Sequence, residues 1–423
     1  MSDQILGNLS PYSTREQLMQ HFSMMLHSQS TGNNALIEYP YGSNFLTGLN
    51  PLWVFQVVKS RGPRCGPFMM YFDATNKCGD KCPMCFTAEL RKASGLTLQI
   101  DIEKAFRFLD RVISLSPFLK SVVIGGPGEP LQYSHLPEIL EFFFSKGLVT
   151  HIYSSGHGDS NACIEAILKY ATLFRMSLDA SSGETYKLTH GRNDFDRRCN
   201  TIRHLIQLRE ETASEVILGL HFVIQKHNFG EIFAFAELAK NLRVDYVEYV
   251  WESYYTVMGL TDDEASDACG LLGQARELGQ DNFSVITPVQ RPKHRLVQER
   301  MIKMTGAQVE RHCSDLTGCL NFTVGGFVSL CAKERFNSKS LFNLGEVSED
   351  VATRLNTGIR NGFADILPIE AFDVGCSSCF CNNYNRAMRT IVNFIQQNDD
   401  AEALLISESR DFCPIQPIAL TVT

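Results

Sequence analysis

Three cysteines, Cys78, Cys82 and Cys85, lie within eight residues of one another in the stretch "NKCGDKCPMCF". Thiols this close together could pack, form disulfides, bind zinc or bind an iron–sulfur cluster. A structural zinc site usually takes four protein ligands, and the nearest further cysteine in the sequence, Cys65, lies on the far side of an apolar run at 68–73. Zinc, an iron–sulfur cluster and a purely structural role therefore stay open on the spacing alone, although zinc lacks a nearby fourth cysteine.

A second group of cysteines lies in the C-terminal part of the chain. Its members are Cys313, Cys319, Cys331, Cys376, Cys379 and Cys381. The chain has 14 cysteines in all, and in a reducing compartment clustered cysteines are better explained by metal or redox chemistry than by disulfides. A zinc ribbon stays open for this second group. Cys163 and Cys269 lie in helical patterns, where we expect them to pack as small hydrophobic residues.

Length and composition restrict the class of protein. With 423 residues, 44% hydrophobic and 20% charged, the chain is typical of a soluble globular protein with one large and one smaller domain. The net charge of -8 offers no basic surface for a phosphate backbone, so no nucleic-acid partner is expected. The sequence has no apolar run long enough to span a membrane and no signal-peptide pattern, which predicts a cytoplasmic location without a membrane partner.

The elements that must position the first cysteine group alternate in type. Apolar runs of strand length, rich in Val, Ile, Phe and Tyr, occur at 68–73, 121–126, 149–155, 173–179, 215–224 and 244–250. Helical patterns occur at 102–116, 135–147, 159–171, 195–211, 229–241 and 262–279. Nearly continuous apolar strands that alternate with helices predict an α/β fold, a parallel sheet wrapped by helices and closed or partly closed into a barrel.

The carboxyl ends of such strands usually carry the ligand site. The cysteine loop follows the first strand directly, and the second strand ends in "GGPGEP" at 125–130. The glycines of that loop permit close approach of the backbone, and Glu129 supplies a carboxylate. The third and fourth strands end in "SSGHG" and "SLDAS". One edge of the sheet is therefore expected to hold the thiols, an acidic glycine-rich loop and small polar groups.

The Cys-x3-Cys-x2-Cys loop followed by a GGxGEP-like loop resembles the radical S-adenosylmethionine (radical SAM) superfamily over about residues 66–255. The resemblance implies a partial (β/α)6 TIM-like barrel in which Cys78, Cys82 and Cys85 bind three irons of a [4Fe-4S] cluster and S-adenosylmethionine chelates the fourth. It further implies a flavodoxin- or ferredoxin-type electron donor and cleavage of S-adenosylmethionine to a 5'-deoxyadenosyl radical. That radical would abstract a hydrogen atom from the substrate, while the protein supplies position and substrate choice.

The same resemblance implies a set of residues that bind S-adenosylmethionine. Gly125, Gly126 and Glu129 match the loop that receives the methionine ammonium. Ser177 and Arg192 match residues near the methionine carboxylate or the ribose. The other cofactor-binding candidates, from the third-strand turn and the adenine side, are Ser154, Ser155, Asn228, Met84 and Phe86. Simple alternatives stay open: a loop carboxylate for Glu129, a strand-end cap for Ser177 and a surface charge for Arg192.

The spacing of Cys313, Cys331 and the pair Cys376 and Cys379 is similar to the SPASM or twitch extension of this superfamily. The resemblance implies a small C-terminal α+β domain with an auxiliary [4Fe-4S] cluster that these four residues close. In that extension, "NFTVGGFVSLCA" would be a β-hairpin with its turn at two glycines.

Additional cysteines leave a second auxiliary cluster open, although one is favoured. The further ligand candidates are Cys319 and Cys381. The expected organisation is an N-terminal helical or irregular extension (1–65), the radical SAM partial barrel (66–258), linking helices (259–305), and the SPASM/twitch domain with a C-terminal tail (306–423).

Several functions stay open on the sequence alone. We favour hydrogen abstraction from a small biosynthetic substrate such as a sugar, an aminocyclitol or a nucleoside-like molecule, with dehydrogenation or epimerisation as the outcome. The first 65 residues lack the three-strand pattern of a leader-binding module, which disfavours the alternative of crosslinking or epimerising a ribosomally made peptide. A non-catalytic electron-transfer or maturation protein is the second alternative.

Candidate catalytic residues lie near the end of the sixth predicted strand and in the tail. They are Glu248, Glu252, Tyr254 and Cys413, and none of them is assigned firmly. The alternative for the first three is a set of core aromatics with a solvated carboxylate. The sequence gives no indication of the oligomeric state.

Overall fold

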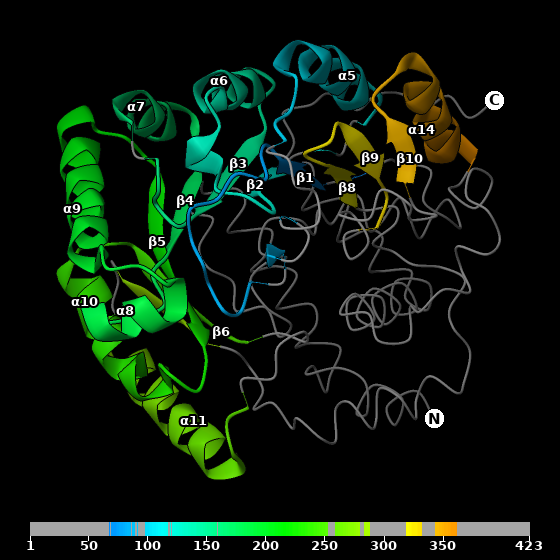
Figure 1. Ribbon diagram of the computed structural model, residues 1–423. Helices are drawn as coiled ribbons and strands as arrows, with labels where there is room; N and C mark the ends of the chain where they lie inside the picture. Colours follow the sequence, from blue (N-terminus) through cyan, green and yellow to red (C-terminus); the bar gives the residue numbers. More distant parts are fainter. Residues whose placement is uncertain are drawn as a thin grey trace, which may run out of the picture.

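Within the residues that the structure describes, one ten-stranded sheet organises the fold (Figure 1). The computed structural model describes residues 67, 69–85, 87, 88, 91, 98–116, 119, 121–158, 160–252, 259–279, 283–287, 319–331 and 343–361. The strands are β1 Met69–Asp73, β2 Ser121–Gly125, β3 Val149–Ser154, β4 Leu173–Ser177, β5 Ile217–Ile224, β6 Tyr246–Trp251, β7 Ser284–Ile286, β8 Cys319–Phe322, β9 Phe327–Ser329 and β10 Asn343–Glu346. Their order in the sheet is β10-β9-β8-β1-β2-β3-β4-β5-β6-β7.

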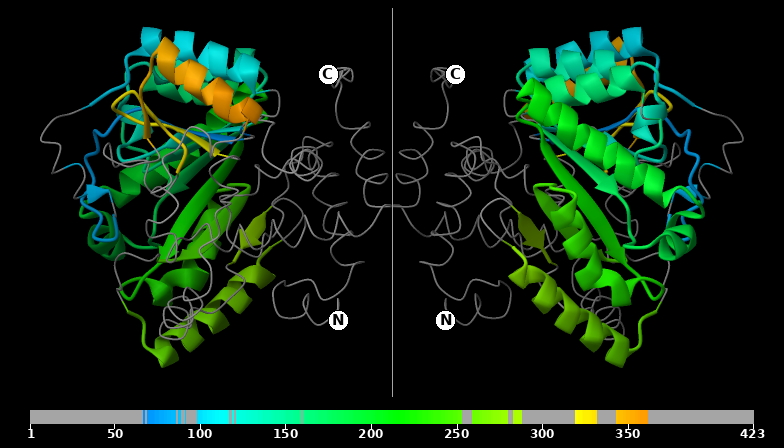
Figure 2. Two further views of the ribbon diagram at one scale, coloured as in Figure 1. Left: turned by 90° about the vertical axis from the view of Figure 1, so that its right-hand side faces the viewer. Right: turned by 90° about the vertical axis from the view of Figure 1, so that its left-hand side faces the viewer.

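Neighbouring strands from β1 to β7 all pair in parallel, which confirms the expected α/β class and the repeat of strands and helices. The helices are α5 Ile102–Leu115, α6 Leu136–Ser145, α7 Asn161–Tyr170, α8 Gly183–His190, α9 Phe195–Thr212, α10 Ile232–Asn241, α11 Asp262–Glu277 and α14 Glu349–Asn361, with short 3-10 turns η2 Pro130–Gln132 and η3 Phe229–Glu231. Apart from α8, the helices that connect the strands lie along the outer side of the curved sheet (Figures 1 and 2). No helix in the described part of the chain is long and apolar enough to cross a membrane.

Local sequence explains where a typical helix begins and which side it buries. Asp101 precedes α5, and its side chain accepts a hydrogen bond from the backbone N–H of Lys104, which satisfies one of the free donors at the helix start. The residues that α5 buries recur every three or four positions, namely Ala105, Phe108, Leu109 and Val112. This spacing gives a helix one apolar side, and that side packs on the sheet.

Helix α8 and strand β7 were not predicted. The pattern after the fourth strand predicts one helix, at 195–211, whereas the structure has α8 before α9. Ser182 caps α8 by accepting from the backbone N–H of Thr185, and Gly191 ends it in the left-handed conformation, with φ of 67°, as is common for a helix C-cap. Polar residues fill much of α8, so its periodicity is weak. The three-residue strand β7 was also missed, because so short a run carries no period.

The C-terminal hairpin is part of the same sheet. Strands β8 and β9 pair antiparallel on either side of a turn that contains Gly325 and Gly326, which confirms the predicted hairpin. Strand β8 also pairs with β1 in parallel, so residues far apart in sequence become neighbours. The predicted domain boundaries stay predictions, but in the described residues the hairpin adds strands to the barrel sheet.

The two sides of the sheet differ in chemistry. On the outer side, the Phe72 ring lies 5.5 Å from the Phe143 ring of α6 and stacks 5.2 Å from the Phe322 ring of β8. These three residues are fully buried. On the inner side, the register sets Tyr153 beside Arg175, and Arg175 beside Gly219. A hydrophobic layer therefore joins sheet to helices, while polar groups line the inner wall.

Replacing Phe322 with Ala tests whether β8 packs on the barrel as described. The substitution removes a fully buried ring, so the free energy of unfolding is expected to fall by about 3–5 kcal/mol. The matched control is Phe144→Ala, because Phe144 is 56% exposed, and its effect should stay within about 0.5 kcal/mol. Urea titration followed by circular dichroism measures both values. Equal effects of the two substitutions would contradict the packing of β8 against β1.

Candidate functional site

The loop that follows β1 carries Cys78, Cys82 and Cys85, all half-buried. No helix or strand covers residues 76–82, so the backbone depends on neighbouring segments for its hydrogen bonds. The Lys77 carbonyl accepts from the backbone N–H of Glu129 at 2.7 Å. The contacts from the α8 side are a bond of 3.1 Å from Lys81 N to the His190 carbonyl and one of 3.1 Å from Arg192 Nη1 to the Gly79 carbonyl. The ends of β2 and α8 thus hold the loop in place.

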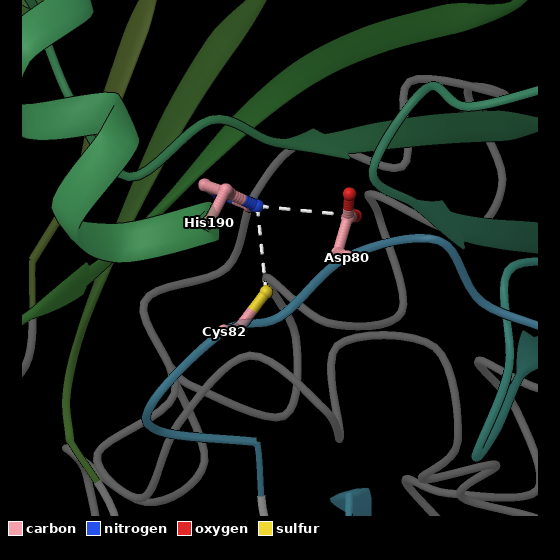
Figure 3. Close-up of side chains that lie close together, drawn as sticks. All are labelled: Asp80, Cys82 and His190. Carbon is pink, nitrogen blue, oxygen red and sulfur yellow. Dashed lines mark hydrogen bonds and ion pairs between the residues drawn. The ribbon is translucent and has the colours of Figure 1, made fainter. Parts of the chain in front are cut away.

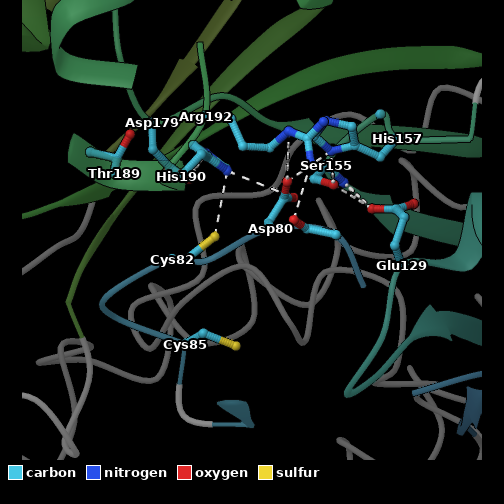
Figure 4. Close-up of polar contacts among 12 residues, drawn as sticks. Asp80, Cys82, Cys85, Glu129, Ser155, His157, Asp179, Thr189, His190 and Arg192 are labelled. Atoms are coloured by element: carbon cyan, nitrogen blue, oxygen red, sulfur yellow. Dashed lines mark hydrogen bonds and ion pairs between the residues drawn. The ribbon is translucent and has the colours of Figure 1, made fainter. Parts of the chain in front are cut away.

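A largely buried charge network includes Asp80 of this loop (Figure 4). The imidazole of His157 bridges two carboxylates, with Nδ1 2.9 Å from Asp80 Oδ1 and Nε2 2.9 Å from Asp194 Oδ2. Burial alone would lower the pKa of His157, but its bonds to Asp80 and Asp194 raise it. Burial alone would raise the pKa of Asp80, but its hydrogen bonds, led by the one from His157, lower it. A positive charge is therefore held between two negative ones.

His190 connects the network to a thiol (Figure 3). Its Nε2 lies 3.0 Å from Asp179 Oδ2, and its Nδ1 lies 3.5 Å from Cys82 Sγ and 4.0 Å from Asp80 Oδ2. The ring stacks on Tyr186, with centroids 4.6 Å apart. Asp179 also accepts from the backbone N–H of Val223 in β5 at 2.6 Å. The contacts from Cys82 through His190 and Asp179 therefore end on the sheet.

The glycine-rich loop after β2 fits tightly against the cysteine loop. A Cβ at Gly128 would lie 2.3 Å from the Thr75 carbonyl oxygen and 2.7 Å from that of Lys77. Gly126 has a φ of 112°, a conformation that side chains disfavour. The close approach expected of these glycines is therefore present, and it is directed at the backbone of the cysteine loop.

Glu129 lies inward, with both carboxylate oxygens engaged. Its Oε1 accepts from Ser154 Oγ at 2.5 Å and from the backbone N–H of Leu131 at 3.0 Å, and its Oε2 accepts from the Ser155 backbone N–H and hydroxyl, both at 2.6 Å. This buried carboxylate therefore joins the glycine-rich loop to the turn after β3. The structure brings together the three candidates Glu129, Ser154 and Ser155, and it orients the carboxylate toward the two serines.

The other candidates near the loop lie in different settings. Met84 and Ser177 are half-buried. The guanidinium of Arg192 lies near two carboxylates, with Nε 3.7 Å from Asp80 Oδ1 and 3.4 Å from Asp194 Oδ1. The buried side chain of Asn228 donates to the Asp179 carbonyl at 3.0 Å and to the Val223 carbonyl at 2.8 Å. Asn228 thus stabilises the end of β5, and its predicted role at the adenine stays a prediction.

Some candidates of the sixth strand and of the second cysteine group lie in the described residues. Glu248 is buried and hydrogen-bonded to Arg175, and Glu252 is half-buried just after β6. Cys319 is buried at the start of β8, and Cys331 is half-buried. The candidates that lie outside the described residues are Phe86, Tyr254, Cys313, Cys376, Cys379, Cys381 and Cys413.

The arrangement of the three loop thiols fits an iron–sulfur cluster better than it fits a single zinc ion. In the described part of the chain, the ligand atoms of Asp80, Cys82 and His190 lie within 4.8 Å of one another, and neither Cys78 nor Cys85 belongs to that group. One zinc ion would draw all its ligand atoms together at one centre, whereas the cysteines of a cluster bind different irons. Burial raises the pKa of Cys78 to about 11 and also raises that of Cys82. Deprotonation of these two thiols would therefore require a strongly cationic partner at this position.

Comparison with known proteins identifies the domain. The model of the radical SAM superfamily matches residues 73–239, which include the cysteine loop, the glycine-rich loop and the network around His157. The chain contains a radical SAM domain. Such a domain uses a [4Fe-4S] cluster and S-adenosylmethionine, and the three thiols of the loop match that requirement.

Similar proteins come from two comparisons. The tungsten-containing aldehyde ferredoxin oxidoreductase cofactor-modifying protein of Pyrococcus furiosus is 23% identical over 178 residues, which are 42% of this chain. The match spans about half of that relative, 49% of its length. The crystal structure of Streptococcus suis SuiB bound to its precursor peptide SuiA has a TM-score of 0.53 at 15% identity and covers 80% of this chain and 79% of SuiB. The structure of SuiB bound to S-adenosylmethionine has a TM-score of 0.51 at 14% identity and covers 70% of this chain and 68% of SuiB.

These structural likenesses show the radical SAM fold and confirm the expected barrel class. Sequence reasoning nevertheless missed ionisable residues of the site, among them Asp80, His157, Asp179 and His190. One signal was present, since Asp80 lies between two of the loop cysteines. The others follow strands or end a helix that the pattern did not predict, so their convergence requires the fold.

Replacing His157 with Gln tests the charge network. Because the pKa of His157 is raised in the folded protein, its contribution to stability is complete below the unfolded value of about 6.5 and is lost as the pH rises through the folded value. The difference in free energy of unfolding between wild type and His157→Gln should therefore shrink from pH 6 toward pH 9. The exposed His204 provides the control His204→Gln. A difference that does not depend on pH would contradict a protonated His157.

Proposed function

We propose that the protein is a radical SAM enzyme that abstracts a hydrogen atom from a small polar biosynthetic substrate, such as a sugar, an aminocyclitol or a nucleoside-like molecule, and that it dehydrogenates or epimerises this substrate. The main support is that the cysteine loop and the glycine-rich loop are locked together at the carboxyl ends of β1 and β2. When bound, the cluster and S-adenosylmethionine supply the electron and the radical chemistry.

The polar inner wall of the barrel supports a polar substrate. Arg175 of β4 hydrogen-bonds Glu248 of β6, and its guanidinium lies 3.7 Å from the centroid of the Tyr153 ring. Both charged side chains are buried. Charged groups are rarely buried without a partner, and the Arg175–Glu248 pair gives the wall fixed donors and acceptors toward which hydroxyl groups can orient.

Two histidines extend this wall. His151 lies on β3 and His221 on β5, where the register sets it beside Glu248. Burial, together with the charge of Arg175, lowers the pKa of His151 to about 4 and lowers that of His221 well below its usual value. Both rings are therefore neutral at pH 7, and a neutral imidazole has one donor and one acceptor nitrogen. This chemistry suits the hydroxyl groups of a polyol or sugar.

Modification of a ribosomally made peptide is the second candidate. Its support is the fold likeness to SuiB, whose structure contains a precursor peptide. The P. furiosus relative, a cofactor-modifying protein, favours a small molecule instead. We keep the small polar substrate as the first proposal because the buried inner wall presents charges and imidazoles.

We also propose that the C-terminal region forms a SPASM/twitch-type domain with one auxiliary [4Fe-4S] cluster. In the described hairpin, Asn321 pairs with Ser329. The same antiparallel register, extended by two residues, sets Cys319 opposite Cys331. A cluster near this hairpin could accept the second electron of a dehydrogenation. Iron and sulfide content per chain would separate one auxiliary cluster from two.

Anaerobic incubation with S-adenosylmethionine and dithionite tests the enzyme proposal. Wild type should produce 5'-deoxyadenosine, and Cys82→Ala should reduce the rate to background because it removes a cluster ligand. The matched control is Cys269→Ala, which alters a half-buried cysteine of α11 and should keep wild-type activity. Absence of 5'-deoxyadenosine from a wild-type protein that contains iron would contradict the proposal.

Replacing Glu248 with Gln tests the inner wall. The substitution removes the carboxylate that neutralises Arg175 in a buried position, so the free energy of unfolding should fall by about 3 kcal/mol. The control Glu237→Gln alters an exposed carboxylate of α10 and should change stability by less than about 0.5 kcal/mol. Urea titration measures both values. Equal, small effects would show that the Arg175–Glu248 pair is not buried as described.

A further inference from the structure

Arg91 lies six residues after Cys85, and one nitrogen of its guanidinium contacts three groups. Its Nη1 donates to Pro127 O at 2.6 Å, to Thr87 Oγ1 at 2.9 Å and to Cys85 Sγ at 3.3 Å. The first of these acceptors belongs to the glycine-rich loop and the last to the cysteine loop. One side chain therefore joins the two loops that define the radical SAM site.

The buried Thr87 completes this junction. Its hydroxyl donates to Pro127 O at 3.3 Å and lies 3.2 Å from Cys85 Sγ. A carbonyl oxygen has two lone pairs, and Arg91 and Thr87 together engage both of those on Pro127. The Pro127 carbonyl is therefore already occupied, and an ammonium group that binds to the glycine-rich loop must use other acceptors.

The chemistry of arginine suits this position beside a sulfur ligand. A guanidinium is always protonated in proteins, so its donation to Cys85 Sγ does not depend on pH. The other two thiols have different donors: Cys82 Sγ lies 3.5 Å from the ring of His190, and the backbone N–H of Asp80 bonds Cys78. Cys85 is thus the thiol contacted by a permanent positive charge.

We propose that Arg91 is a positioning residue of the radical SAM site. It sets the distance between the cysteine loop and the glycine-rich loop through the Pro127 carbonyl, and it stabilises negative charge on the Cys85 sulfur. Hydrogen bonds and positive charge at cluster sulfurs favour the reduced state, which raises the reduction potential. Arg91 thereby couples the electronics of the cluster to the shape of the loop that receives S-adenosylmethionine. This inference rests on the proposed function in one respect: the site must bind the [4Fe-4S] cluster and S-adenosylmethionine.

The test compares Arg91→Gln and Arg91→Lys with wild type. The matched control is Arg203→Gln, because Arg203 is exposed on α9 and its Nη1 bonds the neutral Asn200 side chain at 2.8 Å. The measurements, made anaerobically on reconstituted protein, are iron and sulfide content, the midpoint potential from an EPR-monitored redox titration, and the dissociation constant of S-adenosylmethionine.

We expect Arg91→Gln to bind the cluster with a more negative midpoint potential and to bind S-adenosylmethionine about tenfold more weakly, as for the loss of a charged hydrogen bond. Arg91→Lys keeps the charge and should be intermediate, and Arg203→Gln should match wild type. Thr87→Val, which keeps the guanidinium, should shift the potential less than Arg91→Gln. A variant at Arg91 that folds, as judged by circular dichroism, but no longer takes up iron would also support the proposal.

Two results would overturn the inference. The first is a midpoint potential and an affinity for S-adenosylmethionine in Arg91→Gln that equal those of wild type. This result would count whether or not the thermal stability of the variant falls, because a purely structural residue would change stability alone. The second is a change of potential and affinity in Arg203→Gln as large as that in Arg91→Gln, since the effect would then come from any loss of positive charge. Failure of the wild type to cleave S-adenosylmethionine would instead contradict the proposed enzyme function and leave the measured potential of Arg91→Gln interpretable.

Discussion

The site depends on one constraint: residues 76–82 of the cysteine loop form no helix or strand, so the loop backbone lacks the regular hydrogen bonds of such elements and takes several partners from other segments. Those partners come from the carboxyl ends of neighbouring elements, with Glu129 N bonding the Lys77 carbonyl and the His190 carbonyl accepting from Lys81. Side chains then fix the loop in a second way, through the bridge of Asp80, His157 and Asp194. The parallel sheet matters because it brings all of these ends to one edge.

A single set of strands performs two physical tasks. Alternate residues point to opposite sides, so Phe72 contributes to an apolar layer under the helices while Arg175 belongs to the polar inner wall. The outer layer supplies most of the burial that stabilises the fold. The inner wall contributes less of it, because burying the Arg175–Glu248 pair requires desolvation of both charges. Apolar packing and buried polar groups are therefore separated across a sheet one residue thick.

The sequence predicted what local pattern can encode. Apolar runs and helical periods indicated the parallel sheet, the cysteine spacing indicated the cluster loop, and two glycines indicated the hairpin. It did not reveal the charge network, because Asp80, His157 and Asp179 follow different strands and nothing in their spacing shows that they meet. Helix α8 was missed for a related reason: its stability comes from caps and from packing more than from an apolar period. The inward position of Glu129 likewise depends on the turn after β3.

The pairing of β1 with β8 has a consequence for how the chain folds. Met69, at the start of the first strand, pairs with Cys319, which is made about 250 residues later. During synthesis the first strand emerges early but obtains its second neighbour only after the six strands β2–β7. Pairings between such distant segments close slowly. The cysteine loop begins directly after this strand, so a pairing that can form only late in synthesis also fixes the base of the cysteine loop.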